Sequence, residues 1–194
     1  MRRRACFAAC VVAAALTAAA PSPARAECDA SAADRLEAAI AREAGRARTW
    51  RLVWGYVNDA FAMYSFTALP LVDRPYRIDY AASGVGSVAS AALTFGLPLD
   101  VEGAARPLYD ARALAPCARL EKLRSLRAAY ADDERARVTW PWHALNVVLA
   151  GAVLALVGGG FGHVVDGLTS AAGTLVVGEL QLVTQPTGLT LVSF

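Results

Sequence analysis

The sequence predicts an all-α integral membrane protein in which four transmembrane helices form two parallel helix-hairpin repeats, with two amphipathic helices outside the membrane. Three observations lead to this fold class. The composition is apolar, with 56% hydrophobic residues, 19% charged residues and a mean hydropathy of +0.38. Four apolar stretches approach the length of about 20 residues that a helix needs to cross a bilayer. Finally, landmarks of the first half of the chain recur in the same order in the second half.

Residues 1–26 have the features of a cleaved signal peptide. Arg2–Arg4 is a basic start, Ala5–Ala20 is apolar, and Ala24-Arg25-Ala26 offers a small-x-small cleavage site. We therefore expect the mature chain to be exported across a bacterial inner membrane. An uncleaved signal anchor is the alternative.

Two cysteines, Cys28 and Cys117, remain after this cleavage. Paired cysteines of an exported chain usually close into a disulfide in the oxidising compartment. The two are not a C-x-x-C pair, so we expect a structural bond and no redox-active site.

Two segments with many charged residues are predicted to form amphipathic periplasmic helices. In residues 27–48, Leu36 and Ile40 recur at helical spacing. Residues 100–140 contain a second helix that begins near Pro116, a residue suited to the first turn. No turn signal separates either helix from the apolar stretch that follows, so we expect each helix to continue into a span.

Four apolar stretches are predicted to cross the membrane, and a short periplasmic tail follows them. The first is the least regular, because Arg51, Asn58 and Asp59 interrupt it. The predicted spans are residues 49–71, 80–99, 141–160 and 167–185, and the predicted tail is residues 186–194.

Cleavage of the signal peptide would place both ends of the mature chain in the periplasm. The arrangement runs against the positive-inside tendency, because most basic residues then lie outside. If the first span failed to insert, residues 106–137 would become cytoplasmic and the tendency would be obeyed. We favour four spans because only they bring both cysteines into the oxidising compartment.

The repeated landmarks indicate an internal duplication. The pattern Trp54-x-x-x-Asn58 recurs as Trp142-x-x-x-Asn146, and Asp79 has its counterpart at a similar offset of 87 residues. Because both units would begin outside the membrane, they would be parallel repeats.

Two carboxylates inside predicted spans, Asp59 and Glu179, are the candidates for chemistry. A charge in a span is costly and usually faces a partner or water. Glu179 lies at a depth that Arg51, His143 and Asn146 could reach. The candidate intramembrane polar cluster is Asn58, Asp59, His143, Asn146 and Glu179. The alternative is that these side chains only form hydrogen bonds that fix which helices pack together.

Known catalytic patterns are absent from the sequence, so we do not expect an enzyme or a cofactor. His143 and His163 lie at opposite ends of one predicted span and cannot share a metal, and no dense basic block suggests nucleic acid. The residues before Phe194 resemble the closing strand of an outer-membrane barrel, a further alternative.

The function favoured by these observations is that of a non-enzymatic structural or interaction component of the inner membrane. Its partners would be membrane lipid and a periplasmic or membrane protein, or a second copy of the chain. The alternative is a small transporter, channel subunit or ligand sensor that uses Asp59 and Glu179.

Overall fold

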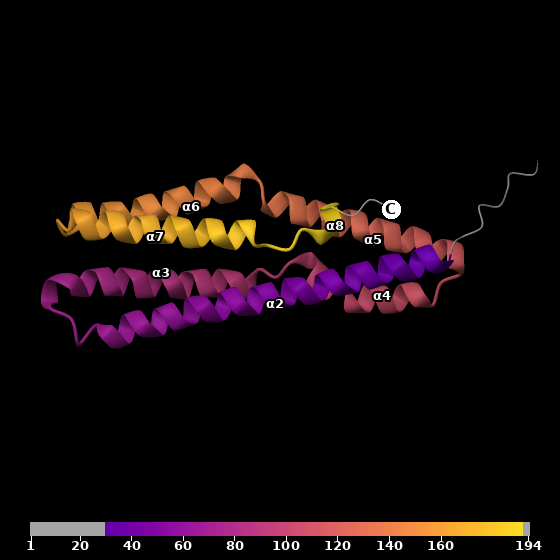
Figure 1. Ribbon diagram of the computed structural model, residues 1–194, viewed down its shortest axis with the longest axis horizontal. Coiled ribbons are helices and arrows are strands. Elements are labelled where there is room, and N and C mark those ends of the chain that lie inside the picture. Colours follow the sequence, from indigo (N-terminus) through magenta and orange to yellow (C-terminus); the bar gives the residue numbers. More distant parts are fainter. Residues whose placement is uncertain (1–29, 192–194) are drawn as a thin grey trace, which may run out of the picture.

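The computed structural model describes residues 30–191, which are largely helical and contain no strand, so the all-α prediction is confirmed for this part of the chain (Figure 1). The predicted signal peptide and Cys28 lie outside the described residues. The helices are α2 (Ala30–Ala68), α3 (Arg77–Gly96), α4 (Ala105–Arg112), α5 (Pro116–Arg137), α6 (Trp140–Val153), α7 (Val164–Val183) and α8 (Gly188–Leu191). Two 3-10 turns, η2 (Arg74–Tyr76) and η3 (Asp100–Gly103), and a π-helical segment, η4 (Leu154–Gly160), connect them.

The molecule is elongated and has two unlike ends (Figure 1). At one end, the α2–α3 hairpin lies beside the α6–α7 hairpin, and we call this part the belt (residues 49–98 and 138–185). At the other end, α4, α5 and α8 pack with the first half of α2, and we call this part the head (residues 30–48, 99–137 and 186–191).

The head has the apolar core of a water-soluble helical domain. Ile40 of α2 and Leu123 of α5 are fully buried, and Leu189 of α8 is 1% exposed. The core cluster consists of Ala33, Leu36, Ile40, Ala47, Leu99, Val101, Ala104, Leu108, Ala111, Leu120, Leu123, Tyr130, Ala131 and Leu189. All of these residues belong to the head.

The belt has the opposite distribution of apolar side chains. Apart from Tyr109, Leu114 and Leu191, every exposed large hydrophobic side chain of the described residues lies in the belt. The positions that the belt buries are mostly small or polar: Gly55, Asn58, Ala62, Ser65, Gly84, Ala91, Ala150, Val157, Gly158, Gly167, Ala171 and Gln185. Small residues let helix backbones approach closely where no hydrophobic effect drives them together.

Aromatic rings pack over glycines in the α2–α3 hairpin. The ring of Phe95 on α3 lies directly over Gly55 on α2, and the ring of Phe66 on α2 lies over Gly84 on α3. A side chain at either glycine would occupy the space of the ring. The two reciprocal contacts therefore fix the register of the hairpin.

A backbone contact joins η4 to α7. A Cβ on Gly167 would stand 2.7 Å from the backbone nitrogen of Gly158, so this approach requires glycine at position 167. The turn between them contains Gly162, whose φ of 77° suits a residue without a side chain. The Gly-rich sequence that ends the third predicted span thus forms a π-helical end and a tight turn.

The two predicted helix-to-span junctions differ. The helix α2 runs unbroken from the expected periplasmic helix into the first expected span. The second junction is interrupted at Val138 and Thr139, contrary to the expectation of a continuous helix. Pro141 explains the break, because it has no N–H and its ring clashes with the carbonyl of Arg137 four residues earlier.

Two short helices were not expected. The helix α4 precedes α5 in the segment predicted to hold one helix, and α8 lies in the segment predicted to be a tail. Leu189 is a member of the head core, so this stretch is docked on the head.

One helical stretch within residues 30–191 is long and apolar enough to cross a membrane, although Val138 and Thr139 interrupt the α-helix within it. It runs over Pro116–Gly160 and so comprises α5, α6 and η4, and only 17% of its most apolar window is buried. This finding supports an association with a membrane. The four-span arrangement and the internal duplication stay predictions.

Candidate functional site

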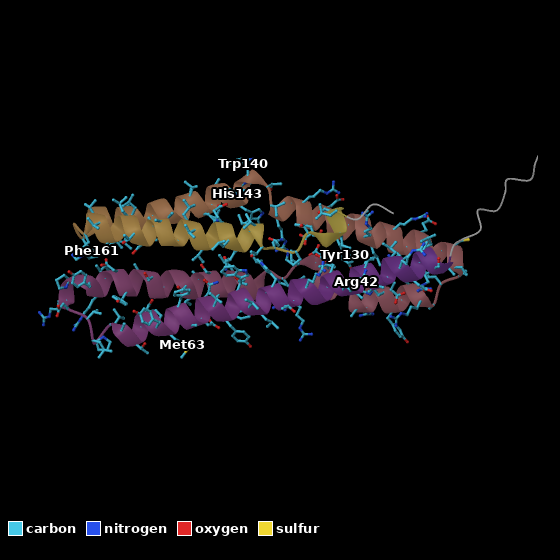
Figure 2. All side chains as sticks on the ribbon, viewed as in Figure 1. Arg42, Met63, Tyr130, Trp140, His143 and Phe161 are labelled. Atoms are coloured by element: carbon cyan, nitrogen blue, oxygen red, sulfur yellow. The ribbon has the colours of Figure 1, made fainter. Side chains whose placement is uncertain are left out.

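The structure brings three of the five residues of the predicted polar cluster together at the end of the α6–α7 hairpin that adjoins the head. His143 Nδ1 lies 2.6 Å from Glu179 Oε2, and Asn146 Nδ2 donates to Glu179 Oε1 at 3.0 Å. His143 and Asn146 are three residues apart on α6, so both side chains face α7. Figure 2 shows His143 near the junction of α6 with the head, far from Phe161 at the other end of the hairpin.

The other two residues of the predicted cluster lie apart from it. Asn58 is buried and donates Nδ2 to the carbonyl of Trp54 at 2.8 Å. Within residues 30–191, Asp59 forms no hydrogen bond or ion pair with His143, Asn146 or Glu179. This half of α2 packs on α3 and not on α6, so depth along the span did not imply contact.

Arg51 was expected to reach Glu179, but it pairs elsewhere. Its Nε lies 2.8 Å from Glu102 Oε2 of η3, and both side chains are largely buried. Glu102 also accepts a hydrogen bond from the backbone N–H of Leu99 at 3.2 Å. The ion pair therefore connects α2 to η3, the turn that follows α3, and so links the belt to the head.

Beside the cluster, the structure shows a cavity of about 130 Å³ between the two hairpins. Its walls come from α2, α3, α6 and α7 and from residues at the border with the head. The lining residues are Trp50, Ser90, Leu93, Thr94, Leu97, Leu99, Arg137, Trp142, Leu145, Asn146, Leu149, Gly178, Gln181, Leu182 and Gln185. Asn146 both lines the cavity and binds Glu179, so the cavity and the cluster are contiguous.

Two side-chain amides in the cavity wall lack partners. The Nε2 atoms of Gln181 and Gln185 are buried and have no hydrogen-bond partner among the described residues, and Gln185 is only 7% exposed. A buried donor without an acceptor costs about 1–3 kcal/mol. Gln181 lies in the last turn of α7, Gln185 follows two residues after its end, and both residues line the cavity.

Another polar residue of the wall, Arg137, already donates three hydrogen bonds to protein acceptors. Its guanidinium donates to Asp133 Oδ1 at 3.0 Å, to the carbonyl of Leu97 at 3.0 Å and to that of Pro98 at 2.9 Å. Arg137 thus connects α5 to the segment that follows α3.

A second polar group lies at the far end of the belt. His163 Nδ1 is 3.8 Å from Asp79 Oδ2 and 3.4 Å from Asp166 Oδ2, and the Tyr76 ring packs edge-on against the imidazole at 6.3 Å. The ligand atoms lie within 4.8 Å of one another, a geometry in which they could hold a metal ion. They also form ion pairs when His163 is protonated. The sequence analysis missed this trio because it compared the two histidines only with each other.

A third polar group fixes α8 to the head. Glu43 Oε1 accepts the backbone N–H of Gly188 at 2.8 Å, and Glu134 Oε2 accepts those of Leu189 and Thr190, each at 3.1 Å. Burial raises the pKa of Glu134 to about 7, and the nearby carboxylate of Glu43 adds to the rise, while the two backbone donors oppose it. This carboxyl is 1% exposed, and its other oxygen has no partner among the described residues.

The start of α5 is held to the start of α2 by a salt-bridge cluster. Arg119 Nη2 lies 2.7 Å from Asp34 Oδ1 and 2.7 Å from Glu37 Oε2, and Arg112 also pairs with Glu37. Burial raises the pKa of Glu37, but Arg119 and Arg112 outweigh it and leave the pKa below its usual value. The cluster is therefore stable as ion pairs at neutral pH.

Of these groups, the cluster of His143, Asn146 and Glu179 with the adjoining cavity is the best candidate site, because a polar network lies beside a half-open space between the hairpins. No residue set in it matches a hydrolytic or transfer template. Comparison of the chain with family models, with curated proteins and with solved structures found no match.

Proposed function

We propose that the protein is a non-enzymatic, polytopic component of the bacterial inner membrane, in which the four belt helices span the bilayer and the head is a periplasmic interaction platform. The supporting observation is that large apolar side chains are buried in the head but exposed in the belt. A water-soluble helical protein buries its large apolar side chains, whereas lipid solvates them. The head would present its helices to a periplasmic or membrane protein, or to a second copy.

The charges and aromatic residues agree with this placement. Residues 80–99 and 144–165 contain no Asp, Glu, Lys or Arg. Trp140 and Trp142 lie at the border with the head, and Trp140 is 76% exposed. Tryptophan at this level is typical of the interface between lipid and water. Together these features support a bilayer whose surface lies at the border between the belt and the head.

The head also supports the expected disulfide. Cys117 lies in the first turn of α5, and the contact of Arg119 with Asp34 brings this turn to the start of α2. Cys28 would precede α2 by two residues. A bond between the two cysteines, together with export, would put the head in the periplasm.

A charge placed in the belt tests the membrane proposal. Val148 on α6 is 65% exposed, and an Arg at the centre of a span costs about 2.5–3.5 kcal/mol of insertion. We expect Val148→Arg to reduce the share of protein that resists alkaline extraction from membranes. Ala128→Arg, at an exposed position of α5, is the matched control and should behave as the wild type. Recovery of the wild-type protein in the alkaline supernatant, without detergent, would contradict the proposal.

The second candidate is a transporter, channel subunit or ligand sensor that uses Asp59 and Glu179. One observation favours it, the network of Glu179 with His143 and Asn146 inside the belt. Under the interaction proposal, liposomes with Glu179→Gln or Asp59→Asn protein should show the same ion and proton flux as wild-type liposomes. A wild-type flux that either variant abolishes, with unchanged helicity, would establish the second candidate.

A further inference from the structure

We infer that the belt binds one divalent transition-metal ion, such as Zn²⁺, at its end away from the head, through Asp79, His163 and Asp166. The ion links the two hairpins at this end, as the head joins them at the other. This site goes beyond the proposed function, which requires no metal. It depends on the geometry of the belt alone, and not on the membrane around it.

The three side chains come together from both hairpins. Asp79 lies in the first turn of α3, Asp166 lies in the first turn of α7, and His163 directly precedes α7. The helix dipole favours a carboxylate in a first turn, which accounts for each aspartate taken alone. It does not account for the approach of both carboxylates to one imidazole nitrogen. The Tyr76 ring packs edge-on against this imidazole and restricts its orientation.

The distances fit a shared ion better than a shared proton. His163 Nδ1 lies 3.4 Å from Asp166 Oδ2 and 3.8 Å from Asp79 Oδ2, longer than the 2.7–2.9 Å that is typical of a charge-assisted hydrogen bond. Ligand atoms that each lie about 2.1 Å from a zinc ion in a tetrahedron are about 3.4 Å apart. All three ligand atoms lie within 4.8 Å of one another, so small side-chain rotations complete the geometry.

Asp79 lacks the partners that a buried carboxylate requires. Its side chain is only 13% exposed, and it accepts no hydrogen bond from residues 30–191. No Arg or Lys of these residues pairs with Asp79 or Asp166, whereas the buried carboxylate of Glu102 faces Arg51. A carboxylate removed from water is costly unless it is paired or coordinates a metal. A bound cation supplies the missing partner.

The donor set identifies the class of ion. Carboxylates suit magnesium, calcium and manganese, whereas imidazole suits zinc, copper, iron and nickel. One neutral imidazole with two carboxylates therefore fits a divalent transition metal, and the two negative charges balance the charge of the ion. The side chain of Asp166 is 41% exposed, so the ion can enter from solvent, and water can complete its coordination.

Isothermal titration calorimetry tests the site, with Zn²⁺ added to the full chain in detergent. The protein carries no histidine tag and is first freed of metal with a chelator. We expect one ion to bind per chain. The variants His163→Ala and Asp166→Asn each remove one ligand and should weaken this binding at least about tenfold.

Matched variants separate binding from folding. Asp166→Asn keeps the shape of a partly exposed side chain, so its helicity in circular dichroism should equal that of the wild type. Asp73→Asn, at an exposed position between α2 and η2, should bind Zn²⁺ as the wild type does. A wild-type chain that binds no ion would overturn the inference. Equal binding by the wild type, His163→Ala and Asp166→Asn would overturn it as well, because the ion would then lie elsewhere.

Discussion

Replacing Ile40 with Ala is expected to lower the free energy of unfolding of the head by about 2–5 kcal/mol. Ile40 is fully buried between α2 and the other head helices, and its truncation leaves a cavity that packed neighbours cannot close. Thermal unfolding in detergent, followed by circular dichroism, measures the loss.

The matched control is an apolar truncation in the belt. Val148 is 65% exposed, so Val148→Ala removes few protein contacts and should change the free energy of unfolding by no more than about 0.5 kcal/mol. A large loss from Val148→Ala would mean that another protein surface covers this face. An Ile40→Ala protein as stable as the wild type would contradict the assignment of the head core.

The second large effect is a pH dependence that originates at Glu134. Its pKa is about 7 in the folded chain and near 4.5 when unfolded, so between these values the folded state binds the extra proton. The stability of the head should therefore fall as pH rises from 4.5 to 7, by roughly 3 kcal/mol in total, and then level off. Unfolding measured at a series of pH values tests this.

The groups that face Glu134 define the controls. Glu43 on α2 and Asp133 on α5 raise its pKa, the backbone donors of α8 lower it, and Arg127 on α5 binds the carbonyl of Leu189. Glu134→Gln keeps an acceptor for α8 and should remove most of the pH dependence. Asp132→Asn, an exposed carboxylate on the same helix, should leave it intact. An unchanged slope in Glu134→Gln would assign the effect to another group.

The sequence predicted the helices of the belt because each is a long apolar run whose ends are marked by charged, glycine or proline residues. The break between α5 and α6 could also have been read from Pro141, but the missing turn signal was given more weight. The helices α4 and α8 are too short to show a period, and α8 depends on Glu43 and Glu134 for its start. Such contacts join residues far apart in sequence and leave no local pattern.

Only part of the candidate site could be predicted, because contacts between residues far apart in sequence leave no local pattern. Spacing along α6 and depth along α7 brought His143, Asn146 and Glu179 within reach of one another, because two helices of a hairpin are neighbours. Depth alone could not show that Arg51 pairs with Glu102 of η3, or that the part of α2 that carries Asp59 packs on α3. The glutamines of the cavity were overlooked because an uncharged amide near a helix end has no marked signal in hydropathy.

The head is assembled from three stretches of chain that are separated by the two hairpins, and Leu189 completes it. Contacts of such high contact order form late, since the intervening chain must be placed first. While the ribosome is still producing α6 and α7, the grooves that later hold Leu189 would remain open to periplasmic chaperones or proteases. Under the proposed topology, the head could complete its core only after its last helix had crossed the membrane.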